Sequence, residues 1–274
     1  MTPRIVLLAS DSRVGRQMLE TFHARGIPLH AVVILTGTFG PPPRRGAGVA
    51  RWVASWPSAL AKTAKRKLVF RLRRRAFFRR LNPRVVATGE LNSARMLRDL
   101  RRLQPDFIVL GGVAVLKEES IATARRGVLN AHPALLPWVR GSGTVGHSLA
   151  LGIPLGATVH LVDRMIDTGA IVQRRLLPVR PGAIPLPQLE LDARRLAAEM
   201  MADVVDAIVR TGDDPPSIPQ PVRYPLVRWP DANGRRKLMA LAEAGHAHEL
   251  YLPWEPLCPG GVVPPEMFDA PPGE

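Results

Sequence analysis

The sequence predicts an α/β protein whose core is an open, twisted, mostly parallel β-sheet of Rossmann-like type. Short apolar runs of strand length alternate with segments whose apolar residues recur at helical spacing, as in parallel sheets with helical crossovers. The chain has 274 residues, of which 46% are hydrophobic, and a mean hydropathy of +0.02. It can therefore bury a large core, which is mainly aliphatic because aromatic residues make up only 5%.

The first half of the chain supplies most of the expected sheet. Strands are expected at residues 4–9, 29–35, 85–88, 107–110 and 127–130. Helices are expected at 14–25, 93–103 and 117–125, the second with Ser93 as its N-cap. A strand–helix–strand start of this kind forms a right-handed parallel unit. Ligands in such sheets bind beyond the carboxyl ends of the strands, where we expect Ser10, Thr88, Gly111 and Asn130.

The second half is expected to close the sheet and add an appendage. After a short helix at 147–151, strands at 158–162 and 171–178 should pair antiparallel around the loop 163–169. A long helix should follow at 186–211. Prolines are frequent beyond it, with a short helical piece at 234–244. We therefore divide the chain into an α/β catalytic domain at 1–212 and a Pro-rich C-terminal extension at 213–274.

Basic residues are concentrated in one segment. The formal net charge is +15, from 38 Lys and Arg and 23 Asp and Glu. Residues 21–89 contain fifteen of the basic residues and no acidic ones. The remainder of the chain therefore has equal numbers of basic and acidic residues. We interpret 41–84 as a basic helical insert, with an amphipathic helix at 58–80.

Three interpretations of the insert 41–84 remain open. It is a solvated helix that caps the domain, or it binds nucleic acid such as tRNA, because uncompensated positive charge attracts phosphates. Phe70, Phe77 and Phe78 beside arginines also fit a helix at an anionic membrane surface, or one that binds an acidic partner.

Other features narrow the class of protein. The lone cysteine, Cys258, excludes an intramolecular disulfide and a cysteine metal cluster. His246 and His248 are two residues apart and do not share a helix face, so no metal site is expected. The apolar run at 5–9 is too short for a signal peptide, and no run reaches membrane length. We expect a cytoplasmic protein without a transmembrane segment.

Asn130, His132 and Asp167 offer an amide, an imidazole and a carboxylate to one site. Asn130 and His132 occupy alternate positions after an apolar strand, so their side chains point to the same side. Pro133 and Pro137 then end regular structure and shape a loop. The alternative is structural: Asn130 caps a turn, His132 is satisfied in the core, and Asp167 begins an Asp-Thr-Gly turn.

The wider pattern resembles the folate-dependent formyltransferase family. It consists of Asn130-x-His-Pro-x-Leu-Leu-Pro137, Gly141, the run Gly-Ala-Thr-Val-His-Leu-Val-Asp at 156–163, and Asp167-x-Gly-x-Ile-Val172. The strong resemblance covers about residues 104–180, and a weaker one covers 3–35. The family includes glycinamide ribonucleotide transformylase, methionyl-tRNA formyltransferase and sugar N-formyltransferases. The combination at this spacing is far more specific than any one of its parts.

The resemblance implies one-carbon chemistry: transfer of a formyl group from 10-formyltetrahydrofolate to an amine, without a metal. It assigns Asn130 as a hydrogen-bond donor to the oxyanion, a role that an amide fills at any pH because it does not titrate. His132 would donate a second hydrogen bond or exchange a proton, and Asp167 would orient His132 or accept the amine proton.

The resemblance also implies binding residues. Folate would lie in a groove with main-chain contacts, between two segments that we assign as cofactor-binding: Leu110, Gly111, Gly112, Val113, Val115, Val162 and Asp163. Adjacent glycines let a flat ring approach the backbone, although such pairs are common after strands. The acceptor would meet Ser10, Arg13, Arg140, Gly141 and His147. Structural roles for Arg140, as a solvated loop residue, and for His147 remain alternatives.

Departures from the family pattern bear on the acceptor. The loop after the first strand carries Asp11, which would repel a phosphate, and this argues against the purine substrate. The residues after Thr211 are Pro-rich and slightly acidic, which argues against tRNA. The first hypothesis is therefore a small-molecule amine or hydroxylamine, such as an amino sugar. A methionyl-tRNA formyltransferase-like enzyme is second, and a non-catalytic scaffold that binds RNA or membrane is third.

Overall fold

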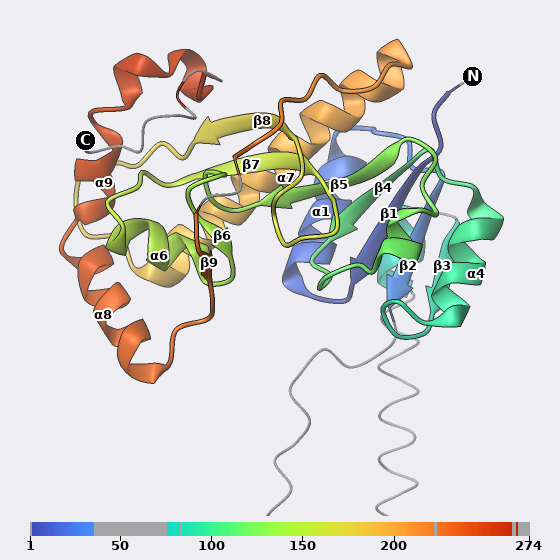
Figure 1. Ribbon diagram of the computed structural model, residues 1–274, viewed down its shortest axis with the longest axis horizontal. Helices are drawn as coiled ribbons and strands as arrows, with labels where there is room; N and C mark the ends of the chain where they lie inside the picture. Colours follow the sequence, from blue (N-terminus) through green and yellow to red (C-terminus); the bar gives the residue numbers. More distant parts are fainter. Residues whose placement is uncertain (1, 36–75, 83, 222–223, 265–266, 268–274) are drawn as a thin grey trace, which may run out of the picture.

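The computed structural model describes residues 2–35, 76–82, 84–221, 224–264 and 267. Its centre is a seven-stranded sheet with the order β3-β2-β1-β4-β5-β7-β8 (Figure 1). Neighbouring strands from β3 to β5 are parallel, whereas β7 is antiparallel to both β5 and β8. The strands are β1 (Ile5–Ser10), β2 (Ala31–Leu35), β3 (Val85–Thr88), β4 (Phe107–Gly111), β5 (Gly127–His132), β7 (Gly156–Leu161) and β8 (Ile171–Leu176). The predicted α/β class and mostly parallel sheet are confirmed.

Helices cover both faces of the sheet. On one face α1 (Arg13–Ala24), α7 (Leu186–Thr211) and the helical residues 76–81 pack against Ile5 and Leu7. On the other face α4 (Ala94–Leu103) and α5 (Glu118–Ile121) pack against Val6 and Leu8. Alternate residues of β1 therefore serve opposite cores, as a strand buried on both faces requires. Ser12 and Ser93 cap α1 and α4, the latter as predicted.

Residues beyond Gly212 pack against the sheet domain. Helices α8 (Ala232–Glu243) and α9 (His246–Tyr251) share an apolar cluster with α6 (Thr144–Ala150) and the first turns of α7. Short strand β9 (Leu226–Val227) pairs with β6 (Arg140–Gly141). Isolated bridges from residues 218 and 262 reach β8, and the 3-10 turns η2 (Glu255–Leu257) and η3 (Pro259–Gly261) lie between α9 and the second bridge. The extension thus forms part of the core and of one wall of the site.

Several element boundaries differ from the predictions. The helix expected at 117–125 ends at Ile121, because the N–H groups of Arg125 and Arg126 donate to carbonyls at 105 and 106 and draw the chain into β5. The helix expected at 147–151 begins at Thr144, after Gly143 turns the chain with φ +70°.

The predicted basic insert 41–84 lies mostly outside the described residues. Of the helix expected at 58–80, the described part begins at residue 76 and is helical. No helix among the described residues is long and apolar enough to cross a membrane.

Candidate active site

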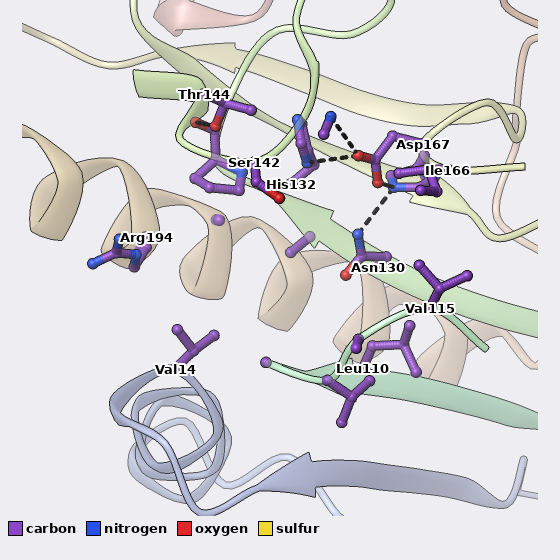
Figure 2. A pocket seen from close by; sticks show the side chains of 18 of the residues that line it. Val14, Leu110, Val115, Asn130, His132, Ser142, Thr144, Ile166, Asp167 and Arg194 are labelled. Atoms are coloured by element: carbon purple, nitrogen blue, oxygen red, sulfur yellow. Dashed lines mark hydrogen bonds and ion pairs between the residues drawn. The ribbon is translucent and has the colours of Figure 1, made fainter. Parts of the chain in front are cut away.

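A cavity of about 870 Å³ opens beyond the carboxyl ends of β4 and β5. Its walls come from α1, the turn after β4, β5, the loop that begins at Gly141, the loop 162–167, α7 and residues 226–229. Figure 2 shows Leu110 and Val115 toward one end and Arg194 toward the other, with Asn130, His132 and Asp167 between them. The predicted catalytic residues therefore meet at the middle of a two-ended cavity, where an open α/β sheet places its ligands.

Strand β5 presents Asn130 and His132 to the cavity, as their alternate positions predict. The antiparallel strand β7 places His160 opposite Asn130, and the Asn130 Nδ2 atom lies 3.1 Å from His160 Nε2. His160 Nδ1 lies 2.7 Å from the Leu161 carbonyl, which can only accept, so Nδ1 carries the proton. With the proton on Nδ1, the Nε2 atom can accept a hydrogen bond from one of the two Asn130 N–H groups. The second amide N–H remains for a ligand.

Asp167 is held in the left-handed region, with φ +55°, which is uncommon for a residue other than glycine. Its Oδ2 atom accepts the Gly141 N–H at 2.9 Å. The buried Gln220 side chain donates to the Asp167 carbonyl at 3.2 Å and to the Gly169 carbonyl at 2.6 Å. The Arg140 guanidinium donates to the Ile166 carbonyl at 3.2 Å. Contacts on both sides of the turn therefore fix where the carboxylate points.

The Asp167 carboxylate lies between two imidazoles. Its Oδ2 atom is 3.5 Å from His132 Nδ1, and its Oδ1 atom is 3.6 Å from His160 Nε2. His132 Nε2 donates to the Val139 carbonyl at 2.9 Å. With Nε2 as its donor, the neutral form of His132 presents an unprotonated Nδ1 atom to Asp167. The carboxylate and the His132 ring therefore lie close enough for the charge of one to affect the pKa of the other.

Burial and neighbouring groups shift the pKa values of His132 and Asp167. Burial lowers the pKa of His132, and the nearby Asp167 carboxylate only partly opposes that effect. Burial alone would raise the pKa of Asp167, but His132, His160 and the Gly141 N–H together hold it well below its usual range. At neutral pH the carboxylate is therefore ionised and His132 is neutral.

The end of the cavity near Leu110 and Val115 has mainly apolar walls. Of the seven residues expected to bind the cofactor, all but Gly111 line the cavity. Gly111 instead lets α1 and β1 pack closely against β4. A Cβ atom there would lie 3.3 Å from the Gly15 Cα atom and 3.1 Å from the Ala9 Cβ atom. Gly112 takes φ +67° and turns the chain into the wall.

The structure brings few of the expected acceptor residues to the cavity. Gly141 lines it, whereas Ser10 and Arg13 do not. Ser10 is buried, and its hydroxyl hydrogen-bonds to Ser12 and to the Gly112 carbonyl. Arg13 is exposed at the start of α1.

Arg140 and His147 have structural contacts instead. Arg140 is buried rather than solvated, and its guanidinium donates to the Ile166 and Tyr224 carbonyls at 3.2 and 3.0 Å. His147 Nε2 donates to the Arg228 carbonyl at 2.8 Å. Both side chains attach the extension to the domain, and neither lines the cavity.

Ser142 and Thr144 line the cavity within the segment 141–147 that was expected on its acceptor side, whereas sequence reasoning missed Glu190, Arg194, His160 and residues 226–229. The sequence could have identified His160 as a cavity residue, since it lies inside the 156–163 run, on a strand expected beside the site. Glu190 and Arg194 are four residues apart and so share a face of the predicted long helix. No local signal in the sequence placed 226–229 beside Gly141. Among the described residues, no group of three or more His, Cys, Asp or Glu side chains could hold a metal.

Fold and site together define an α/β protein with an amide and an imidazole on β5 and a carboxylate on the loop between β7 and β8. The model of the formyl transferase family matches residues 4–205 of the chain. The protein belongs to that family.

Named relatives cover several branches of the family. A methionyl-tRNA formyltransferase of Chlorobium phaeovibrioides is 33% identical over 113 residues, which are 41% of this chain and 33% of that protein. A phosphoribosylglycinamide formyltransferase of Mycobacterium tuberculosis is 41% identical over 81 residues, 29% of this chain and 38% of that protein. The aligned part thus spans well under half the length of these curated relatives.

A solved structure shares the fold over nearly the whole chain. It is the formyltransferase PseJ of Anoxybacillus kamchatkensis, in complex with UDP-4,6-dideoxy-4-formamido-L-AltNAc and tetrahydrofolate. The TM-score is 0.50 with 15% sequence identity, and the match covers 90% of this chain and 96% of that one.

Proposed function

We propose that the protein transfers a formyl group from 10-formyltetrahydrofolate to the amine or hydroxylamine of a small molecule. One observation carries the proposal. Asn130, His132 and Asp167 meet at the middle of a cavity that has an apolar end and a charged end. A transfer reaction needs such an arrangement, because donor and acceptor must approach the same polar groups from different sides.

The apolar end fits the formyl donor. Leu110, Val113, Val115 and Val162 line it, and aliphatic walls of this kind suit the flat ring of a folate. Asp163 also lines this end, but its Oδ1 atom already accepts from Met165 N at 3.0 Å and Thr168 Oγ1 at 2.5 Å. We therefore assign recognition of the ring to the walls and the main chain. When bound, the folate supplies the formyl carbon.

Asn130 is assigned to stabilise developing negative charge. Attack by an amine on a formyl carbon places negative charge on the carbonyl oxygen. Asn130 lines the cavity, and His160 holds its amide through one N–H, so the direction of the other N–H is fixed. A donor that is already oriented stabilises the transition state without reorganising during the reaction.

The Asp167 and His132 pair is assigned to take the proton that the amine loses. The carboxylate is ionised and the facing Nδ1 atom of His132 is unprotonated at neutral pH. The pair can hold one proton without placing a net positive charge in a buried site. His132 is 4% exposed, which limits exchange of that proton with solvent.

An amino sugar or another small amine is the first candidate acceptor. The fold shared with PseJ, whose structure holds a formamido sugar and tetrahydrofolate, supports this choice. The second candidate is methionyl-tRNA, favoured by the name of the Chlorobium relative and by the basic residues in 41–84. Binding of nucleic acid or of an anionic membrane by that segment stays a prediction.

Titration calorimetry of the full chain with the stable analogue 10-formyl-5,8-dideazafolate tests the donor. We expect saturable binding that Asn130→Ala leaves nearly unchanged. Absence of binding to the wild-type chain would contradict the proposal.

A salt titration tests the insert. Binding of initiator tRNA, or of vesicles rich in phosphatidylserine, that weakens steeply as salt rises would support a contact through 41–84. Failure of both probes to bind at low salt would leave the solvated helix as the interpretation of the insert.

A further inference from the structure

The acceptor end of the cavity has a wall that the extension supplies. Residues 226–229 line the cavity and are fixed to the loop that begins at Gly141. Strand β9 pairs with β6, and the Ser142 N–H donates to the Val227 carbonyl at 3.0 Å. The His147 side chain donates to the Arg228 carbonyl at 2.8 Å. The wall is therefore held by main-chain contacts at successive residues.

Two glycines make room for this wall. A Cβ atom at Gly141 would lie 2.1 Å from the Val227 carbonyl oxygen, closer than two non-bonded atoms can approach. A Cβ atom at Gly143 would lie 3.3 Å from the Trp229 ring. Both glycines also have positive φ, +105° and +70°. The loop can hold the extension this closely only because these positions lack side chains.

Trp229 stands on this wall with much of its ring uncovered. It is 60% exposed, whereas Trp138 and Trp254, the other tryptophans among the described residues, are buried. The ring packs against Gly143, which lies between Ser142 and Thr144 in the sequence. Figure 2 shows those two residues on the side of the cavity away from Leu110 and Val115. An uncovered indole on a rigid wall offers a flat surface for a ring to stack on.

Two arginines and one glutamate, Arg194, Arg228 and Glu190, line the cavity at the same end. Arg194 lines the cavity from α7 and lies 3.5 Å from Glu190, which also pairs with Arg235 at 3.2 Å. Two guanidinium groups thus share one carboxylate. Arg228 is the second arginine of the lining, whereas Arg235 lies outside it. An acceptor with an anionic group would balance this charge, and arginine is well suited to bind phosphate oxygens.

We propose that Trp229, Arg194 and Arg228 form a subsite for the nucleoside diphosphate part of the acceptor, and that residues 226–229 select the acceptor. The base would stack on Trp229 and the phosphates would contact the two arginines. This inference rests on the proposed function, because it places the group that carries the reacting amine. It assigns the extension a direct part in substrate choice.

Titration of the full chain with UDP, uridine and inorganic pyrophosphate tests the subsite. We expect UDP to bind more tightly than either fragment. Trp229→Ala should weaken UDP by about tenfold or more and leave pyrophosphate unchanged, since a stacked base is lost. Arg194→Gln should weaken both UDP and pyrophosphate. Arg195→Gln is the matched control, because Arg195 is the next residue on α7, pairs with Asp192 and does not line the cavity.

The folate analogue separates this inference from the proposed function. Each variant should bind 10-formyl-5,8-dideazafolate as the wild-type chain does. If the analogue binds and UDP does not, or if Trp229→Ala binds UDP normally, the subsite is wrong while the function stands. If Arg194→Gln weakens the analogue and not UDP, the arginine serves the folate tail and the subsite is again wrong. If the analogue itself fails to bind the wild-type chain, the proposed function is wrong.

Discussion

Gln220 offers a sensitive test of how the extension supports the site. Its amide donates to the carbonyls of Gly169 and Asp167, at 2.6 and 3.2 Å, and it is only 8% exposed. The Asp167 carbonyl follows directly after the left-handed backbone of that residue, φ +55°, which aims its carboxylate. Gln220→Ala removes both hydrogen bonds and changes none of the three side chains proposed to act in catalysis, Asn130, His132 and Asp167.

The expected size of the effect follows from these two bonds. Each buried carbonyl that loses its donor costs about 1–3 kcal/mol, and the longer bond contributes less. Water that enters near the turn recovers part of the loss, so we expect about 2 kcal/mol of lost stability. A domain of this size loses about 2–4 °C in Tm per kcal/mol, so Tm should fall by about 4–8 °C.

Two measurements check the prediction. Thermal unfolding gives the change in stability, with Gln188→Ala as the control, because Gln188 is exposed and bonds only to Asp192. An NMR pH titration of the histidine rings gives the position of Asp167. The carboxylate raises the pKa of His132 against the larger effect of burial. The pKa of His132 should therefore fall further when Asp167 turns away.

The His132 signal can be assigned by comparison with His132→Gln. A lower Tm with an unchanged His132 titration would refute the reasoning, because Gln220 would then stabilise the fold without positioning the carboxylate. An unchanged Tm would refute it as well.

Four further predictions test other contacts. Asn130→Ala should lower turnover by about a hundredfold or more while binding of the folate analogue stays nearly constant, and equal losses in both would contradict the assigned role. Asp167→Asn should lower turnover without unfolding the chain, as circular dichroism can show; an unfolded variant would make the residue structural. Gly141→Ala should displace the extension wall, because its Cβ would lie 2.1 Å from the Val227 carbonyl oxygen, and should lower the unfolding midpoint. The folded-state pKa of His132 is depressed, so its contribution to stability is present above about pH 6.5 and lost as pH falls toward the folded-state value. As pH falls below about 6.5, the free energy of unfolding measured in urea should fall less for His132→Gln than for the wild-type chain. An identical fall in both would contradict the burial argument.

The sheet could be predicted because its signals are local. Apolar runs such as 5–9 and 107–110 are strands buried on both faces, and Ser93 caps the helix it was expected to cap. Where the predictions were wrong, distant contacts decide the structure. The helix expected at 117–125 ends early because carbonyls at 105 and 106 bind the N–H groups of Arg125 and Arg126.

The site was only partly predictable for the same reason. Strand alternation correctly placed Asn130 and His132 on one side, facing the cavity with Asp167. It could not show that Arg140 and His147 donate to carbonyls at 224 and 228, because those partners are some eighty residues away in the sequence. The same separation concealed Trp229, whose place beside Gly143 depends on the pairing of β6 with β9.

The central claim is tested most directly by turnover of 10-formyltetrahydrofolate. The full chain would be incubated with the donor and with one acceptor at a time: a nucleotide-linked amino sugar, glycinamide ribonucleotide or methionyl-tRNA. Release of tetrahydrofolate would be followed by absorbance, and the acceptor product by mass. We predict a gain of one formyl group on an amino-sugar nucleotide, lost in Asn130→Ala. The account would be contradicted if the wild-type chain bound the donor but, with every acceptor, consumed it no faster than Asn130→Ala does.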